Sequence, residues 1–255
     1  MIASMTTWPP RQQSCIEAYK AIIQQQHSEP VKFILVLSKD EWTYKSSKTI
    51  VDAMHDMGVE LMWDEGNRMS HKKLMPVLER YSDEDILVVD DDAEQQNGWL
   101  QAFIDDHKKH PHDIIYGVSV SKVEMVNDKI SEDTVHRGLY VSPGEVTINV
   151  KPANGAAGTL YPAGTFADKR FFDRDAYMEL CSTSDETWQW AWAVIEGRTH
   201  RCLSKYNFPH AINANQDCAL WNTNKNRYSD YHNAIAEAYP EYKERLLLLI
   251  KNKKL

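Results

Sequence analysis

The chain has 255 residues, of which 42% are hydrophobic and 26% are charged, and its formal net charge is -8. This composition is typical of a globular protein with a buried core and excludes a disordered or fibrous chain. The acidic balance argues against a nucleic-acid partner bound through a broad basic surface. No run approaches the ~20 apolar residues that cross a bilayer, no secretion signal is recognisable, and the four cysteines show no zinc-ligand spacing. We therefore expect reduced thiols and a cytoplasmic location.

The first half of the chain alternates short apolar runs with segments of helical periodicity. This alternation predicts strands crossed by helices, which is the pattern of an α/β layer structure. Gly58 is suited to end the second helix. The expected strands are residues 2–5, 31–37, 59–63 and 86–89, and the expected helices carry apolar stripes over residues 16–23, 50–57 and 74–81.

The second half is less regular, and neither an internal repeat nor a linker is recognisable in it. We therefore expect one domain over residues 1–255. Asn127 and Asp128 lie at the centre of an expected hairpin. The other predicted elements are a helix from residue 99 that Pro111 stops, a strand over residues 114–120, a glycine-rich stretch over 154–164, a helix over 185–195 that Gly197 ends, a strand over 199–203 and a terminal helix from Pro240 to about residue 251.

Three consecutive aspartates, Asp90, Asp91 and Asp92, follow the apolar run 86–89. Alternation along a strand would place Asp90 and Asp92 on one face and Asp91 elsewhere. Close carboxylates repel unless a cation lies between them, and Mg²⁺ or Mn²⁺ accepts one or two protein carboxylates while phosphate oxygens complete its shell. Ligands of open α/β sheets bind beyond the carboxyl ends of strands. The trio predicts a metal that carries a phosphorylated substrate, and a solvated acidic turn is the alternative.

A basic segment lies between the third expected strand and the next helix, with Arg68, Lys72 and Lys73 close together. Because a helix N-terminus favours anions, these cations do not serve the helix dipole. A bound diphosphate would account for them, and a solvated basic loop is the alternative.

Two acidic residues, Asp185 and Glu186, open the helix that carries Trp188 and Trp192. A carboxylate beside a bound substrate can act as a general base, although acidic residues in a first turn also simply stabilise the dipole. The two tryptophans share a helix face, which suits core packing or sugar stacking. Near the end of the chain, the apolar run 246–250 is flanked by basic residues and predicts either a docked helix or a contact with an anionic membrane. These basic residues are Lys243, Arg245, Lys251, Lys253 and Lys254.

Five motifs occur in the order found in the metal-dependent GT-A glycosyltransferases, and the chain resembles the small bacterial enzymes similar to family 2 that build surface polysaccharides. Together the motifs span nearly the whole chain. They are Ser-Met-Thr-Thr-Trp-Pro-Pro-Arg at 4–11, Ser-His-Lys-Lys-Leu-Met-Pro at 70–76, Val-Val-Asp-Asp-Asp at 88–92, Gly-Thr-Leu-Tyr-Pro-Ala-Gly at 158–164 and Ser-Asp-Glu-Thr-Trp at 184–188. In the fourth motif Ala163 stands where the family more often has proline.

The resemblance implies a Rossmann-like GT-A fold with a mixed, mostly parallel central sheet flanked by helices. Residues 1–120 would form the nucleotide-sugar half, and residues 121–255 the acceptor half with the C-terminal helix. Together with the patterns above, it gives these candidate site residues: Asp92, Asp90 and His210 for the metal; Thr6, Thr7, Arg11, Asp64, Arg68, Lys73, Asp90 and Asp91 for the donor; Asp185 or Glu186 for the catalytic base, with Asp185 preferred; and Gly158, Tyr161 and Trp188 for the acceptor. A structural role is the alternative for His210.

The leading hypothesis is therefore an Mn²⁺- or Mg²⁺-dependent transferase that moves a sugar, with inversion, from a nucleoside diphosphate sugar to a carbohydrate. A UDP-sugar is the expected donor, and a glycan or lipid-linked saccharide is the expected acceptor, with peripheral contact at the inner face of a membrane and the oligomeric state left open. One rival is a sugar-phosphate nucleotidyltransferase, which would carry a glycine-rich basic loop after the first strand, whereas residues 5–11 hold no glycine. The other is a sugar-nucleotide-binding protein without turnover.

Overall fold

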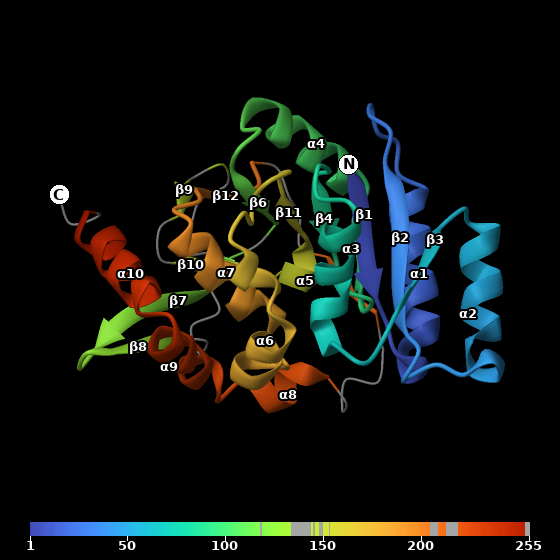
Figure 1. Ribbon diagram of the computed structural model, residues 1–255. Helices are drawn as coiled ribbons and strands as arrows, with labels where there is room; N and C mark the ends of the chain where they lie inside the picture. The colour runs from blue at the N-terminus through green and yellow to red at the C-terminus, as the bar shows by residue number, and fades with distance from the viewer. Residues whose placement is uncertain are drawn as a thin grey trace.

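The computed structural model describes residues 1–117, 119–133, 144, 146–147, 150–152, 154–204, 209–212 and 219–252. In this part of the chain the centre is an eight-stranded sheet (Figure 1). Its strands are β1 (Ile2–Thr6), β2 (Lys32–Ser38), β3 (Glu60–Asp64), β4 (Ile86–Val88), β6 (Ile114–Tyr116), β9 (Val146–Thr147), β11 (Thr159–Tyr161) and β12 (His200–Cys202).

The order across this sheet is β3-β2-β1-β4-β11-β6-β12-β9. The first four strands are parallel to one another, and β12 is parallel to β6. Strand β11 is antiparallel to both of its neighbours, and β9 is antiparallel to β12. The expected α/β fold with a mixed, mostly parallel sheet is confirmed.

Helices cover both faces of the sheet, which is why apolar residues of one strand point to both sides. In β2, Ile34 and Val36 belong to one apolar cluster, whereas Leu35 and Leu37 belong to the other. The second cluster contains side chains of α1 (Gln12–Ile23), α2 (Tyr44–Asp56) and α4 (Trp99–Lys109). The first contains those of α3 (Met75–Arg80), α6 (Arg174–Cys181), α7 (Asp185–Ile195), α9 (Tyr228–Ala238) and α10 (Pro240–Asn252).

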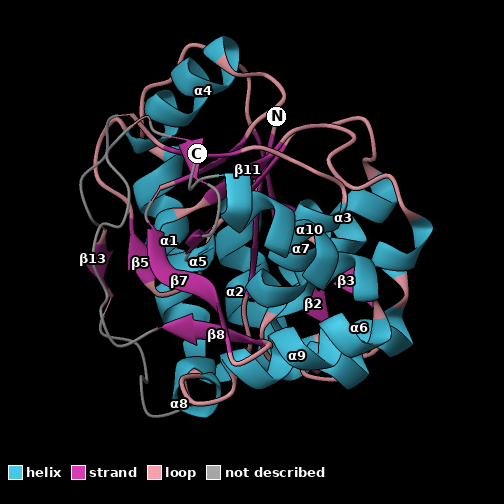
Figure 2. Ribbon diagram, turned by 90° about the vertical axis from the view of Figure 1, so that its left-hand side faces the viewer, coloured by secondary structure: helices cyan, strands magenta, loops and turns pink. Residues whose placement is uncertain are grey.

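Two smaller sheets and several short helices complete the described structure. The three-stranded sheet has the order β10-β7-β8 and lies beside α9 and α10 (Figures 1 and 2). Its strands are β7 (Ser119–Val126), β8 (Lys129–Asp133) and β10 (Val150–Pro152). The two-stranded sheet pairs β5 (Ala93–Glu94) with β13 (His210–Ala211), and the short helices are η1 (Pro9–Arg11), η2 (Met69–Lys73), α5 (Asn154–Ala157), η3 (Lys169–Phe172) and α8 (Leu220–Asn224).

The hairpin centred on Asn127 and Asp128 is confirmed as β7 and β8, and both turn residues have positive φ angles, as a type I′ turn requires. The single strand expected over residues 114–120 was wrong. Strand β6 ends at Tyr116, and β7 begins at Ser119 in a different sheet. At Gly117 a Cβ atom would meet the carbonyl oxygen of Ala157 at 2.2 Å, so the chain leaves the large sheet where only glycine fits.

The terminal segment is a docked helix, because Tyr242 and Leu246 of α10 are fully buried. Lys253 and Lys254 of the expected basic tail lie outside the described residues. No helix in the described ranges is long and apolar enough to cross a membrane. Cys15, Cys181 and Cys202 are buried free thiols, and Cys218 is outside the description.

A substitution at Gly158, which directly precedes β11, measures how tightly the chain packs there. Its φ angle is +83°, and a Cβ atom there would lie 2.6 Å from Cζ2 of Trp99. Gly158→Ala combines backbone strain with overpacking and should lower the free energy of unfolding in urea by about 3 kcal/mol. Gly164 has a φ angle of +70° with nothing within 4 Å, so Gly164→Ala carries the strain alone and should cost about 1 kcal/mol. Equal losses in the two variants would contradict the packing argument.

Candidate active site

The carboxyl ends of β1 and β4 lie side by side in the parallel part of the sheet, and polar side chains follow both strands. Thr7 and Arg11 follow β1, and the acidic trio follows β4. This edge of an open α/β sheet is where ligands bind. The placement expected for the trio is confirmed.

Arg11 holds two members of the trio. Its Nη1 atom lies 3.0 Å from Oδ1 of Asp91 and 2.9 Å from Oδ2 of Asp92, and the Thr7 hydroxyl donates to Asp91 at 2.6 Å. Burial raises the pKa of Asp91 to about 6, although Arg11 opposes this shift. The expectation that Asp90 and Asp92 share a face while Asp91 points elsewhere was wrong, because β4 ends at Val88 and strand alternation stops there.

Lys73 connects the trio to helix α7. Its Nζ atom lies 2.8 Å from Oδ1 of Asp90 and 3.1 Å from Oδ2 of Asp185, and its side chain is 3% exposed. Burial alone would lower the pKa of Lys73, but Asp185 and Asp90 outweigh it and hold the pKa well above its usual value. A buried ammonium group therefore joins Asp90 to Asp185, which are 95 positions apart in the sequence.

The two acids that open α7 have different surroundings. Burial raises the pKa of Asp185, but Lys73 and His71 outweigh it and leave the pKa below its usual value. The Asp185 side chain is 3% exposed and also accepts from Nε2 of Gln189 at 3.2 Å. Glu186 is 23% exposed, and burial raises its pKa although Lys151 opposes this. Glu186 is therefore both more accessible and easier to protonate than Asp185.

The remaining cations of the basic segment are paired with carboxylates rather than solvated. Arg68 lies 3.1 Å from Asp64 and 2.6 Å from Glu79, and Lys72 contacts Glu41. Asp64 ends β3 and is 5% exposed. These pairs lie at the same edge of the sheet as the trio, since β3 and β2 are parallel to β1. The Thr6 hydroxyl is occupied differently, because it donates to the Val36 carbonyl oxygen at 2.8 Å.

The residues expected to bind a metal are only partly gathered. His210 is exposed on β13, and its Nε2 atom lies 3.3 Å from Nε2 of Gln96. Strand β13 is nevertheless anchored beside the trio, because the Ile212 amide donates to the Asp92 carbonyl oxygen at 2.9 Å. Within the described ranges no three His, Cys, Asp or Glu side chains form a metal-binding group. The donor set still fits Mg²⁺ or Mn²⁺, because such ions accept one or two carboxylates and take phosphate oxygens for the rest.

The residues expected to bind the acceptor lie inside the protein, and this burial does not support that expectation. Trp188 is 0% exposed and donates through Nε1 to the Phe171 carbonyl oxygen at 3.0 Å. Tyr161 is 2% exposed and donates to Oε1 of Gln189 at 2.8 Å. Gly158 packs against Trp99. The three residues therefore help to form the core under the site.

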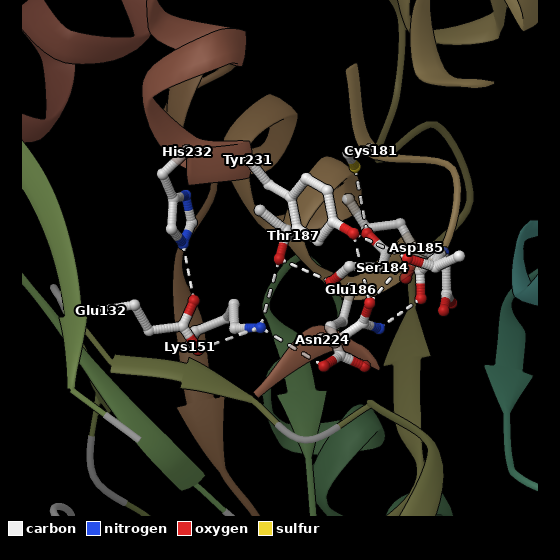
Figure 3. A network of polar contacts seen from close by, with 12 residues as sticks. Glu132, Lys151, Cys181, Ser184, Asp185, Glu186, Thr187, Asn224, Tyr231 and His232 are labelled. Atoms are coloured by element: carbon white, nitrogen blue, oxygen red, sulfur yellow. Dashed lines mark hydrogen bonds and ion pairs between the residues drawn. The ribbon is translucent and has the colours of Figure 1, made fainter. Parts of the chain in front are cut away.

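Lys151 is a site residue that the sequence pattern did not reveal. It lies on β10, is 1% exposed and places its Nζ atom 3.4 Å from Oε1 of Glu186 and 3.3 Å from Oγ1 of Thr187 (Figure 3). No motif marks it, because a single lysine in a three-residue strand is indistinguishable from a surface lysine. A buried environment is the only signal, and it exists only in the folded chain.

Comparison with solved structures places this fold. The S. aureus TarS 1–349 structure matches with a TM-score of 0.57 at 15% identity, over 93% of this chain and 72% of TarS 1–349. The complex of TarS 1–349 with UDP matches with a TM-score of 0.54 at 15% identity, over 85% of this chain and 61% of the other. The complex of TarS 1–349 with UDP-GlcNAc matches with a TM-score of 0.51 at 16% identity, over 83% of this chain and 58% of the other.

TarS is a GT-A-type glycosyltransferase, and the present chain shares this fold. It spans about a third of the longer TarS chain, with 36% of that chain covered. No family model matches the sequence, and no curated protein matches it.

Proposed function

We propose that the protein is a glycosyltransferase that moves a sugar from a nucleoside diphosphate sugar, with a UDP-sugar as the expected donor, to a hydroxyl group of a carbohydrate. The observation that carries this proposal is Lys73, which pairs with Asp90 of the trio on one side and with Asp185 of α7 on the other. One buried cation thus holds the acidic trio, which we propose lies at the diphosphate, next to the acids that open α7. The shared fold with TarS, which has been solved with UDP and UDP-GlcNAc, supports the donor class.

The acid that removes the acceptor proton is Glu186 in this proposal, in place of the Asp185 that the motif favoured. A general base needs access to the substrate and a pKa not far below the working pH. Glu186 is 23% exposed and its pKa is raised by burial, whereas Asp185 is 3% exposed and committed to Lys73. Asp185 then keeps Lys73 in place, and Glu186 performs the proton transfer.

The reaction proposed is a direct displacement at the anomeric carbon. The acceptor oxygen forms a bond to that carbon, the bond to the diphosphate oxygen breaks with its electron pair, and the acceptor proton passes to the carboxylate of Glu186. The nucleoside diphosphate is the leaving group, and attack from the opposite side inverts the anomeric centre. Arg11 and Lys73 provide fixed positive charge at the edge where the diphosphate is proposed to bind.

Asp92 and Asp90 are the proposed protein ligands of Mn²⁺ or Mg²⁺, with His210 as a candidate third ligand. The side chain of Asp92 is 21% exposed, and Arg11 contacts its carboxylate. When bound, the ion would offset the negative charge of the departing diphosphate.

The proposed donor and metal can be tested together by thermal unfolding with a panel of nucleotide sugars, with Mn²⁺ or with EDTA. A donor at about 100 times its dissociation constant should raise the Tm by about 5 °C or more, because it binds only the folded state. Asp92→Asn should remove the Mn²⁺-dependent part of this shift and lower transfer at least about 100-fold.

The matched control is Asp83→Asn, an exposed aspartate remote from this edge, which should behave as the unaltered protein. Mn²⁺-dependent transfer by Asp92→Asn at a normal rate would overturn the metal assignment. A nucleotidyltransferase would instead release pyrophosphate from a nucleoside triphosphate and a sugar phosphate. A binding protein without turnover would show the Tm shift but no transfer to any acceptor.

A further inference from the structure

A buried ion-pair chain lies behind the acid pair and is not part of the expected donor or acceptor sites. It runs from Glu186 on α7 through Lys151 on β10 and Glu132 on β8 to His232 on α9 (Figure 3). It ends at Tyr242 on α10. Lys151, His232 and Tyr242 are almost completely buried, and the Glu132 side chain is 0% exposed. Burying this many polar groups is unfavourable unless each one is paired.

The donor and the acceptor of each hydrogen bond around His232 can be assigned. His232 Nε2 lies 2.8 Å from Oε2 of Glu132, and His232 Nδ1 lies 2.7 Å from the Tyr242 hydroxyl. Burial lowers the pKa of His232, so the ring is neutral near pH 7. Because a carboxylate can only accept, Nε2 carries the hydrogen atom and Nδ1 accepts from the Tyr242 hydroxyl. Glu132 is thereby fixed, and its Oε1 atom lies 3.2 Å from Nζ of Lys151.

Lys151 is held on several sides. Besides Glu132, its Nζ atom lies 3.3 Å from the Thr187 hydroxyl and 4.1 Å from the centre of the Tyr228 ring. It also lies 3.4 Å from Oε1 of Glu186. The ammonium group therefore has little freedom to move, and the carboxylate of Glu186 is the one member of the cluster with a partly exposed side chain, at 23%.

We infer that Lys151 is a positioning residue for the proposed transfer: its ammonium group fixes the carboxylate of Glu186 toward the acceptor and keeps it ionised, while the chain of Glu132, His232 and Tyr242 keeps Lys151 in place. This inference rests on the proposed function and deepens it. In this inference the three-stranded sheet serves to place Glu132 and Lys151, on β8 and β10, beside the start of α7.

The charged groups around Glu186 decide the direction of a pH effect. Besides Lys151 on β10, the groups that act on it are Asp185 on α7, Lys73 on η2, Asp90 after β4 and the Tyr228 hydroxyl on α9. Burial raises the pKa of Glu186 and Lys151 lowers it. Removing the ammonium group should therefore raise that pKa further. Because the base must be ionised, the acidic limb of the kcat profile should move to higher pH.

The decisive variant is Lys151→Met. We expect the acidic limb of kcat to move up by about one pH unit, with an approximately tenfold lower kcat below the limb and a donor KM within about twofold of normal. The ¹³Cδ resonance of Glu186, identified by its loss in Glu186→Gln, should show the same upward shift of its titration midpoint. This spectroscopic measurement does not require turnover.

A double variant protects the test against misfolding, because Lys151→Met alone leaves the buried carboxylate of Glu132 without its lysine partner. Glu132→Gln with Lys151→Met removes both charges and should fold while keeping the shifted limb. Lys243→Met is the matched control: it removes a lysine of α10 that lies 2.9 Å from Asp128 at the hairpin, and it should leave the pH profile unchanged.

An unmoved limb and an unmoved Glu186 titration in the folded Lys151 variants would overturn the positioning role. Absence of transfer by the unaltered protein with every donor would instead refute the proposed function, and the carboxylate titration would then still show whether Lys151 controls the ionisation of Glu186.

Discussion

Glu186→Gln is expected to lower kcat by about three orders of magnitude at neutral pH, with the donor affinity nearly unchanged. Glutamine has almost the same shape as glutamate but cannot accept a proton from the attacking hydroxyl. The pairing of Lys73 with Asp185 and Asp90 does not involve Glu186, so the residues proposed to bind the donor should keep their positions. Initial rates of nucleoside diphosphate release with acceptor present measure the first quantity, and the donor-dependent Tm shift measures the second.

The companion variant Asp185→Asn separates the two acids. It removes a partner of Lys73 and should weaken donor binding and stability together with the rate. Glu179→Gln alters an exposed glutamate of α6 and should leave all three unchanged. If Glu186→Gln turned over normally while Asp185→Asn bound donor normally and lost turnover, the base would be Asp185.

Lys73→Met is expected to lower the free energy of unfolding by about 3–5 kcal/mol, measured by urea denaturation. The variant leaves Asp185, whose side chain is 3% exposed, as a buried carboxylate without its cation. Loss of one partner of a buried pair is costly because the remaining charge stays out of water. The donor-dependent Tm shift should also fall, since Lys73 contacts Asp90 of the trio.

Two comparisons test this reason. Lys73→Met with Asp185→Asn leaves no unpaired charge at that position and should recover a large part of the lost stability. Lys48→Met breaks a pair in which Lys48 is 69% exposed and Asp52 is 57% exposed, and such exposed pairs contribute less than about 1 kcal/mol. A loss for Lys73→Met as small as that for Lys48→Met would show that Lys73 is not needed to compensate the buried acids.

The apolar periodicity of the chain was sufficient to predict most of the regular structure. The strands β1 to β4 and the helices between them follow from it, because both faces of the sheet are covered and the middle of each strand is therefore largely apolar. The division of residues 114–120 into β6 and β7 did not follow, since a period of two continues across Gly117 and does not show which sheet each half joins. The alternation expected for the trio did not hold because β4 ends before the first aspartate.

The site shows the same division between local pattern and tertiary contact. Asp90, Asp91, Asp92 and Asp185 could be selected from the sequence because each lies beside a recognisable strand or helix end. Tyr161 and Trp188 were assigned to the acceptor from their motifs, yet they are buried, since a motif does not state which side of an element faces the core.

By itself the sequence determined the α/β layer structure and the edge of the sheet that carries the acidic trio. It also determined that an acid pair opens a helix. Only the tertiary structure decided which cation meets which carboxylate: Lys73 joins Asp90 to Asp185, and Lys151 joins Glu132 to Glu186. The physical reason is that hydrophobic periodicity encodes which face of an element is buried, whereas the charge partners inside depend on distant segments packed against that face.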